Sequence, residues 1–325
     1  MSVEEPFLTS GPVWLRDFHF GWTALTVRKT GARVPYSPSV LAEATAWFRF
    51  FFAVRAADAM GAPFTIAFTP ERARPWYLIW AVSRLAGARF TRDANDADVV
   101  MHFEDKTVSP NGAPLRLKPG AKLINFDCAD VSKSRVAAVF EEAFGYPLAL
   151  DPRTHAGEAV EKSEVNGAHD GRIVHCPMQP LPGRVYQRVI DNRGLDLNHV
   201  DDLRTCTVDG KPVVVFIKRR PLAKRFQNTN SEVLMRAPEQ MFSDDEIGKI
   251  SAFMRGMGMN WGAVDVLRNR DDGKLYIVDA NKTDMGPPIA LPLADKMAAT
   301  RKLAAAFRAF LGRGAWLSRS RSSAT

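Results

Sequence analysis

The chain has 325 residues, of which 46% are hydrophobic and 25% are charged. This is ordinary globular composition, and it excludes a disordered, collagen-like or coiled-coil chain. The 44 basic and 36 acidic residues give a net charge of +8, but six basic residues and no acid lie within 301–325. The remainder is almost neutral, so the charge does not indicate nucleic-acid binding.

Cysteine usage and apolar segments favour a cytoplasmic protein without a membrane partner. The three cysteines are too few and too dispersed for a disulfide framework or a zinc site. The first ten residues are acidic and lack the apolar core of a signal peptide. The most apolar stretch, around 47–54, contains Arg49 and is too short to span a bilayer, so we interpret it as a core helix.

The first half of the chain predicts an α/β unit. Residues 1–60 are rich in aromatic side chains and show no clear pattern. Short apolar runs at 64–68, 98–103 and 122–126 are typical of buried strands, and a helical spacing of apolar residues begins at Pro75. Strand, helix and strand in this order predict a parallel βαβ arrangement.

The second half is dominated by signals for antiparallel strands and their connecting helices. In chain order, the sequence predicts a helix capped by Asp130 or Ser132, a strand at 185–190, a hairpin with a type I′ turn at Asp209-Gly210, a helix opened by a capping box at 243–246, a hairpin at 261–280 and a helix at 293–310.

The last predicted hairpin carries two aspartates within apolar runs. Asp265 and Asp279 each lie seven residues from the expected turn centre at Asp272, so they should face each other on neighbouring strands. Side chains alternate between the two faces of a strand, which places Asn281 on the same face as Asp279. The opposite face carries residues that can pack on a core: Val264, Val266, Tyr276 and Val278.

Two carboxylates and an amide oxygen form a set of hard ligands that suits Mg²⁺, which completes its shell with waters and phosphate oxygens. Charged residues are depleted inside strands, which favours this interpretation. The alternative is a solvated sheet face beside a polar turn.

A metal ion held in this way usually partners a polyphosphate, which needs cationic side chains. Residues 163–171 are polar, contain His169, and could fold over phosphates with their backbone N–H groups, although they are not a Walker A loop. Each cation alone is more simply a solvated surface charge, and their order along the chain is what favours a site. The candidates are Lys133, Lys162, Arg204, Lys218 and Arg219.

Taken together, these pieces resemble the ATP-grasp superfamily over roughly 61–312, in particular ligases of the ribosomal-protein glutamate-adding and D-alanine–D-alanine type. The segments that carry the resemblance are 124–133, 160–171, 185–190, 202–219 and 261–281. Two departures stand out. Asp279 occupies a position where the family usually has glutamate, and the segment that resembles the phosphate loop is poorer in glycine than is typical.

The resemblance implies a fold class of α/β plus α+β, an ATP-grasp fold preceded by a Rossmann-like α/β substrate domain. The implied organisation is an N-terminal segment of unknown role at 1–60, the α/β domain at 61–128, an ATP-grasp domain of two subdomains at 129–312 with a hinge near 185–190, and a basic, disordered tail at 313–325.

The resemblance also implies ATP and Mg²⁺, or Mn²⁺, as cofactors. Lys133, Lys162, His169 and Arg219 would contact the nucleotide, Gln187 would meet adenine, Arg204 and Lys218 would stabilise the transferring group, and Asp265, Asp279 and Asn281 would hold the metal. The expected enzyme is a carboxylate–amine or carboxylate–thiol ligase that forms an acyl phosphate on a small-molecule or peptide substrate, and many relatives are homodimers. The alternatives are an ATP-grasp-like kinase and a nucleotide-binding protein without turnover.

Overall fold

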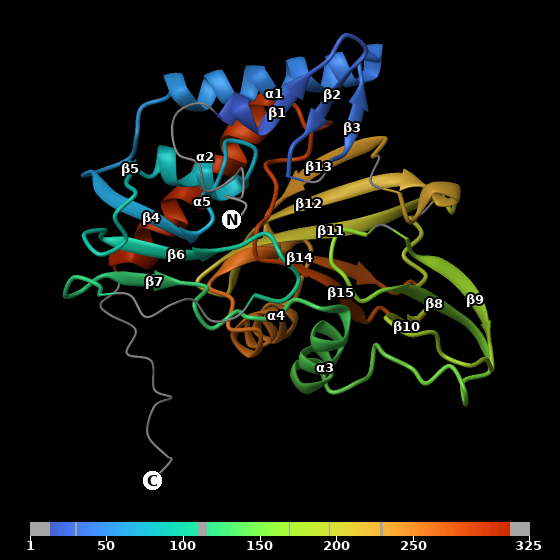
Figure 1. Cartoon of the computed structure of the whole chain (residues 1–325). Helices are drawn as coiled ribbons and strands as arrows, with labels where there is room; N and C mark the ends of the chain where they lie inside the picture. Colours follow the sequence, from blue (N-terminus) through green and yellow to red (C-terminus); the bar gives the residue numbers. More distant parts are fainter. Residues whose placement is uncertain are drawn as a thin grey trace.

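The structure is a computed structural model that describes residues 14–29, 31–109, 116–168, 170–194, 196–227 and 230–312. This part of the chain forms four β-sheets and five α-helices (Figure 1). The predicted basic tail at 313–325 lies outside the described residues. No described helix is both long enough and apolar enough to cross a membrane.

The first described part of the chain, up to residue 56, forms a small antiparallel sheet followed by a long helix. A 3₁₀ turn, Trp14–Asp17, leads into an antiparallel sheet of β1 (Phe18–Phe20), β2 (Ala24–Val27) and β3 (Arg33–Pro35), followed by α1 (Pro38–Ala56). The predicted helix at 47–54 lies inside α1. It is a core helix on one face only, because Phe50 and Phe51 are buried whereas Phe52 is 60% exposed.

The four strands that follow form a parallel sheet, of which the sequence predicts three strands and not the short one at 88–90. They are β4 (Phe64–Pro70), β5 (Ala88–Phe90), β6 (Val99–Phe103) and β7 (Lys122–Ile124), in the order β5-β4-β6-β7. The helix α2 (Leu78–Leu85) begins three residues later than Pro75. Tyr77 forms a β-bridge to Met285, and the Leu78 N–H donates to the Asp284 carbonyl at 2.9 Å, so a distant segment holds Tyr77 extended after a turn at 75–76.

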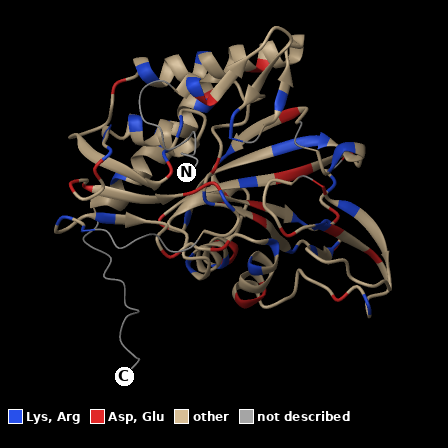
Figure 2. Ribbon diagram, in the orientation of Figure 1, with Lys and Arg blue, Asp and Glu red and all other residues tan. Residues whose placement is uncertain are grey.

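A five-stranded antiparallel sheet forms the centre of the molecule (Figure 1). Its strands are β11 (His199–Val208), β12 (Lys211–Pro221), β13 (Glu232–Arg236), β14 (Trp261–Arg268) and β15 (Leu275–Asn281), in the order β13-β12-β11-β14-β15. The turn between β11 and β12 is the predicted one, with positive φ angles of 54° at Asp209 and 68° at Gly210. Figure 2 shows that residues of both charges lie side by side along this sheet.

The central sheet is covered on both faces. Val214 and Phe216 of β12 pack in a core with α5 (Leu293–Gly312), whereas Val215 and Ile217 pack in a second core with α3 (Lys133–Phe144) and α4 (Asp244–Gly256). This alternation follows from the period of two along a strand. The predicted caps are present, because the Ser132 and Ser243 hydroxyls accept from the third backbone N–H of α3 and α4.

A smaller antiparallel sheet lies beside β15, in the order β10-β8-β9 (Figure 1). Its strands are β8 (Gly157–Ser163), β9 (Arg172–Cys176) and β10 (Arg184–Arg188). The buried Glu161 carboxylate ties the three strands together by accepting hydrogen bonds from Arg172, Arg184 and Tyr186. The 164–171 connection between β8 and β9 is the segment predicted to cover phosphates.

A substitution just after the end of α4 tests how closely the chain packs there. Gly258 has a φ of +65°, and a Cβ there would lie 2.4 Å from the Asp127 carbonyl oxygen. Gly258→Ala is therefore expected to lower the free energy of unfolding by about 2–4 kcal/mol. Gly248 lies on the exposed face of α4, with open space around it. Gly248→Ala should therefore raise the free energy of unfolding by about 0.5–1 kcal/mol. Urea unfolding of both variants measures these changes. Equal changes in the free energy of unfolding would show that the close contact at Gly258 does not limit the packing.

Candidate functional site

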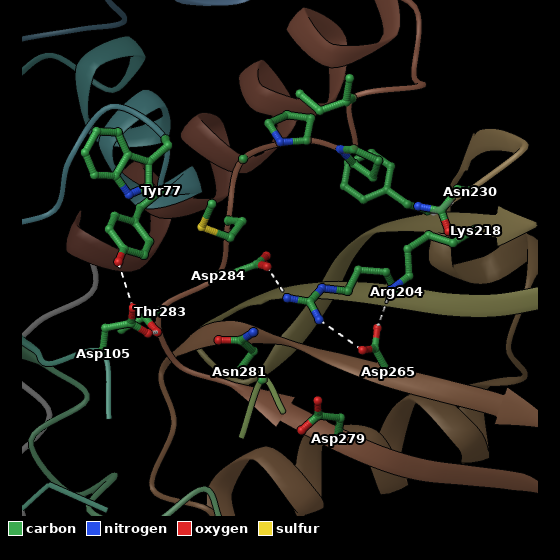
Figure 3. Close-up of a pocket in the computed structure, with 18 of the residues that line it drawn as sticks. Tyr77, Asp105, Arg204, Lys218, Asn230, Asp265, Asp279, Asn281, Thr283 and Asp284 are labelled. Carbon is green, nitrogen blue, oxygen red and sulfur yellow. Dashed lines mark hydrogen bonds and ion pairs between the residues drawn. The ribbon is translucent and has the colours of Figure 1, made fainter. Parts of the chain in front are cut away.

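Three charged side chains form a row across three neighbouring strands. In the strand register, Arg204 of β11 lies opposite Asp265 of β14, and Asp265 lies opposite Asp279 of β15. The predicted juxtaposition of the two aspartates on facing strands is therefore confirmed. Lys218 of β12 lies diagonally across from Arg204, because Arg204 is opposite Phe216. Figure 3 shows these side chains projecting from the sheet into one cavity.

The alternation of side chains explains why these residues share a face. Ala263 packs in the same core as Phe216, and Asp265 and Lys218 are each two residues further along their strands. The face that is apolar under α5 therefore continues as a charged surface where the helix no longer covers it.

A bulge changes one detail of the predicted hairpin. The register shifts between Asp265 and Val266, so Ile277 rather than Val278 lies opposite Val266. Ile277 is fully buried in the core, whereas Val278 is only partly buried. Val278 nevertheless packs against the same core as Val264, Val266 and Tyr276, so the predicted core face is confirmed, and the extra residue on β15 adds the fully buried Ile277 to it.

Asp265 is surrounded by cations. Its two oxygens accept from Arg204 Nη1 and Lys218 Nζ, each at 3.1 Å. Burial alone would raise the pKa of Asp265, but Lys218 and Arg204 outweigh it and hold this pKa well below its usual range. The same guanidinium also forms an ion pair with Asp284, whose side chain is 5% exposed. Burial dominates there and raises the pKa of Asp284.

Asp279 is paired from the other side of the site. Lys133, the first residue of α3, donates to Asp279 Oδ1 at 2.5 Å and to Asn166 Oδ1 at 2.8 Å. Lys162 donates to the Val278 carbonyl at 3.0 Å and forms no ion pair with a described residue. Burial, with some repulsion from Lys133, lowers the pKa of Lys162 to about 8. Lys162 is thus a cation that lacks a carboxylate partner.

A small cavity of about 170 Å³ lies on the Lys162 side of the row. The predicted residues Lys133, Lys162 and Gln187 line it, together with Asp265 and Asp279. Gln187 is buried, and its Nε2 has no hydrogen-bond partner among the described residues. A buried amide donor without a partner fits a ligand that offers an acceptor, such as a nucleobase ring.

The segment 164–171 closes over this small cavity. The Asn166 N–H donates to the Thr107 hydroxyl at 2.9 Å, and Glu164 accepts from the Ser134 N–H in the first turn of α3 at 3.1 Å. At the other end of the segment, a Cβ on Gly171 would lie 2.8 Å from the Phe226 ring. Phe226 therefore packs directly on the segment and narrows the cavity, which is smaller than typical ligand pockets of about 300–1,000 Å³.

A large cavity of about 740 Å³ lies on the other side of the row (Figure 3). Its charged floor contains Arg204, Lys218, Asp265, Asp279 and Asn281. Aromatic side chains from the first half of the chain form part of its wall: Trp47, Phe50, Trp76 and Tyr77. The Tyr77 hydroxyl donates to Asp105 at 2.9 Å, and Thr283 donates to the same carboxylate at 2.8 Å, so this wall is fixed to the segment after β15.

The two cavities meet at the aspartates. Gly167, Asp265 and Asp279 line both. A molecule in the small cavity and a molecule in the large cavity would therefore be separated only by the space around the two carboxylates.

One of the predicted site residues is not brought to this place. Arg219 lines neither cavity and instead pairs with Asp201 and Glu232. His169 lies outside the described residues. The sequence interpretation missed Asp284 and Asn166. Asp284 stands three residues beyond Asn281, where the apolar residues of the predicted strand give way to polar ones, and this change was the available signal. No pattern in the sequence singles out Asn166.

The donor set fits a metal ion held jointly with another ligand. Asp265, Asp279 and Asn281 line the same cavity, and each offers a side-chain oxygen, the donor atom that suits Mg²⁺. No group of three or more histidine, cysteine, aspartate or glutamate side chains with metal-site geometry occurs among the described residues. A metal at this position would therefore depend on oxygens from its partner ligand.

Comparison with known proteins places ATP-grasp ligases among the similar structures. No protein-family model and no curated protein matches the chain. The ATP-grasp ligase PsnB in complex with a minimal precursor is 16% identical, with a TM-score of 0.37, and the match covers 56% of this chain and 65% of that chain, which is less than two thirds of its length.

Two further structures are matched over most of their length. PsnB with minimal precursor, Mg and ADP is 11% identical with a TM-score of 0.45, covering 73% of this chain and 98% of that one. The D-alanine–D-alanine ligase from Bacillus anthracis is 11% identical with a TM-score of 0.43, covering 77% and 97%. These are ATP-grasp ligases, the superfamily that the sequence motifs resemble. Since TM-scores below 0.5 do not define a common fold, the function proposed below rests on the two cavities.

Proposed function

We propose that the protein is an ATP-grasp ligase that uses ATP and Mg²⁺, or Mn²⁺, to activate a carboxylate as an acyl phosphate and to join it to an amine or a thiol. The observation that carries this proposal is the meeting of the two cavities at Asp265 and Asp279. A nucleotide in the small cavity would present its γ-phosphate where a carboxylate bound in the large cavity can reach it.

The positive charges that line the small cavity support the proposal that the nucleotide binds there. Lys133 and Lys162 would contact phosphate oxygens, and Gln187 would offer its unpartnered Nε2 to adenine. Asp265, Asp279 and Asn281 would hold the metal, which supplies positive charge to the β- and γ-phosphates when it is bound. Binding of the phosphates requires the 164–171 segment to release Lys133 and the first turn of α3, because Asn166 and Glu164 now occupy those donors.

The cations that line the large cavity support the proposal that the acceptor carboxylate binds there. Arg204 and Lys218 lie on its floor and would hold the carboxylate that attacks the γ-phosphorus, and they would then stabilise the negative charge of the transferring group and of the tetrahedral adduct. The attacking carboxylate is already ionised, so the first step, which breaks the bond between the γ-phosphorus and the bridging oxygen and releases ADP, needs no base. The amine or thiol then displaces phosphate from the acyl carbon, and its proton leaves with the phosphate or with solvent. Positioning supplies most of this catalysis.

Calorimetric titration of ATP, with and without Mg²⁺, tests the metal and nucleotide assignment. We expect Mg²⁺-dependent binding near 1 μM, about 8 kcal/mol, in the wild type and in Asp271→Asn, which changes an exposed acid at the tip of the same hairpin. In Asp279→Asn the dependence on Mg²⁺ should be lost. Mg²⁺ alone should give no binding, because the protein provides too few ligands. Absence of ATP binding in the wild type would refute the proposal.

The type of reaction is tested with hydroxylamine. An enzyme that forms an acyl phosphate should convert a panel of carboxylic acids to hydroxamates with release of ADP, because hydroxylamine traps the activated acyl group. A stable phosphorylated product that needs no amine would instead indicate a kinase. ATP binding without ADP release for any acceptor would indicate a nucleotide-binding protein without turnover.

A further inference from the structure

A third cavity, of about 450 Å³, lies apart from both cavities described above and shares no lining residue with either. It is enclosed by α1, α2 and the carboxyl ends of β4 and β5. Among the residues that the structure describes, five arginines and no acidic residue line it: Arg55, Arg72, Arg74, Arg84 and Arg92. We call it the arginine cavity.

Most of the positive charge in the arginine cavity is not balanced. Arg74 pairs with the buried Asp17, with Nε 2.6 Å from the carboxylate. The other four arginines form no ion pair with any residue that the structure describes. Burial, together with repulsion from Arg92 and Arg74, lowers the pKa of Arg72. Like charges gathered in a partly enclosed space destabilise one another unless an anion joins them.

The second feature of the arginine cavity is a set of nearly parallel aromatic rings. The Trp80 and Phe90 rings lie 6.2 Å apart with an interplanar angle of 7°. Phe51 stacks on Trp80 at 5.5 Å and 23°, and Phe68 stacks on Phe90 at 6.1 Å and 22°. All four rings line the cavity. Their common orientation presents flat apolar surface to a planar group.

The position of the arginine cavity in the fold is also that of a ligand site. Phe68 and Arg72 come from the carboxyl end of β4 and the residues just after it, and Phe90 and Arg92 from the carboxyl end of β5. These two strands are parallel neighbours. Ligands of open parallel sheets bind at this carboxyl edge, at the switch point that here falls between β4 and β6, and the arginine cavity lies at the same edge beside β5.

We propose that the arginine cavity binds a small aromatic anion, a planar ring that carries a carboxylate or phosphate group, as a non-covalent ligand at a site separate from the nucleotide and acceptor cavities. The rings would hold the planar group, and Arg72 and Arg92 would pair with the anion. A cavity of this volume falls within the range of about 300–1,000 Å³ for small-molecule sites. The proposal does not depend on the ligase function.

Calorimetry on the full chain with phenyl phosphate as probe tests the proposal. Inorganic phosphate and benzyl alcohol serve as probes that keep only the anion or only the ring, and each should bind at least about tenfold more weakly, because each loses one set of contacts. Benzoate in place of phenyl phosphate distinguishes a carboxylate from a phosphate ligand. Affinity should fall when salt is raised from about 50 to 300 mM.

Variants locate the binding. Arg72→Gln combined with Arg92→Gln should weaken phenyl phosphate binding at least about tenfold and should leave the thermal stability equal to or above that of the wild type, because it relieves repulsion. Arg89→Gln is the matched control, since Arg89 lies on β5, is exposed and does not line the cavity. Lys162→Met should leave the binding unchanged. Absence of binding at about 10 mM probe, binding that the arginine variant retains, or binding lost in Lys162→Met would overturn the proposal.

Discussion

Replacement of Arg204 by glutamine should lower the free energy of unfolding by about 3–5 kcal/mol at neutral pH, the usual cost of leaving one member of a buried ion pair without its partner. Arg204 is the shared counter-ion of Asp265 and Asp284, with side-chain exposures of 13%, 16% and 5%. Asp265 would keep Lys218. Among the described residues, Asp284 would keep one side-chain hydrogen bond, from the Cys206 thiol at 3.6 Å, and that weak donor cannot balance a buried charge.

The sign of the pH dependence follows from Asp284. Burial already raises the pKa of this carboxyl above its unfolded value, and Arg204 opposes the rise. Without Arg204 the folded-state pKa rises further, so the folded protein binds more protons than the unfolded chain between the two values. The stability deficit of Arg204→Gln should therefore shrink as pH falls from about 7.5 to 5.

Urea unfolding at both pH values measures this deficit. Arg204→Gln combined with Asp284→Asn should recover part of the lost stability, because no uncompensated charge remains. Arg153→Gln is the control, since Arg153 also pairs with an aspartate, Asp151, but at an exposed site where ion pairs contribute little. An Arg204→Gln protein as stable as the wild type at neutral pH would show that the network does not support the fold.

The affinity for ATP should fall by about tenfold between pH 7 and pH 9, because a pKa near 8 leaves Lys162 about nine-tenths neutral at pH 9. Burial is the main cause of this low pKa. Only the protonated amine attracts phosphate oxygens, and phosphates bound beside it would draw its pKa upward. The phosphates themselves are ionised above neutral pH, so they do not contribute to this change.

Two variants separate Lys162 from other titrating groups. Lys162→Arg keeps a charge throughout this range and should make the affinity independent of pH between about 7 and 9. Lys162→Met should bind ATP about 10–100-fold more weakly at neutral pH, the value of one hydrogen bond to a charged group, again without pH dependence. Calorimetry at fixed free Mg²⁺ provides the measurement. A wild-type affinity that stays constant up to pH 9 would contradict the role of Lys162.

The parts of the structure that were predictable from sequence are those set by local rules. The type I′ turn at Asp209-Gly210 and the caps at Ser132 and Ser243 depend on a few adjacent residues. The pairing of Asp265 with Asp279 follows from counting outward from one turn. In each case the determining interaction spans a short stretch of chain, and the pattern alone contains it.

The parts that could not be predicted depend on contacts between distant segments. The late start of α2 arises because Tyr77 and Leu78 bond to residues more than 200 positions away. The bulge beside Asp265 is a single extra residue with no distinctive sequence, yet it places Ile277 instead of Val278 opposite Val266. The second partner of Arg204, Asp284, lies past the end of β15, where no periodicity extends.

The placement of α1 has a consequence for how the protein can acquire new specificity. Trp47 and Phe50 reach the wall of the large cavity, but no residue of α1 lines the small one. Under the proposed function, this part of the acceptor wall is thus encoded apart from the nucleotide site. Mutational drift or a focused library at 43, 47 and 50 would then reshape the range of accepted molecules, while the proposed phosphate contacts Lys133 and Lys162, which lie on other elements, remain unaltered.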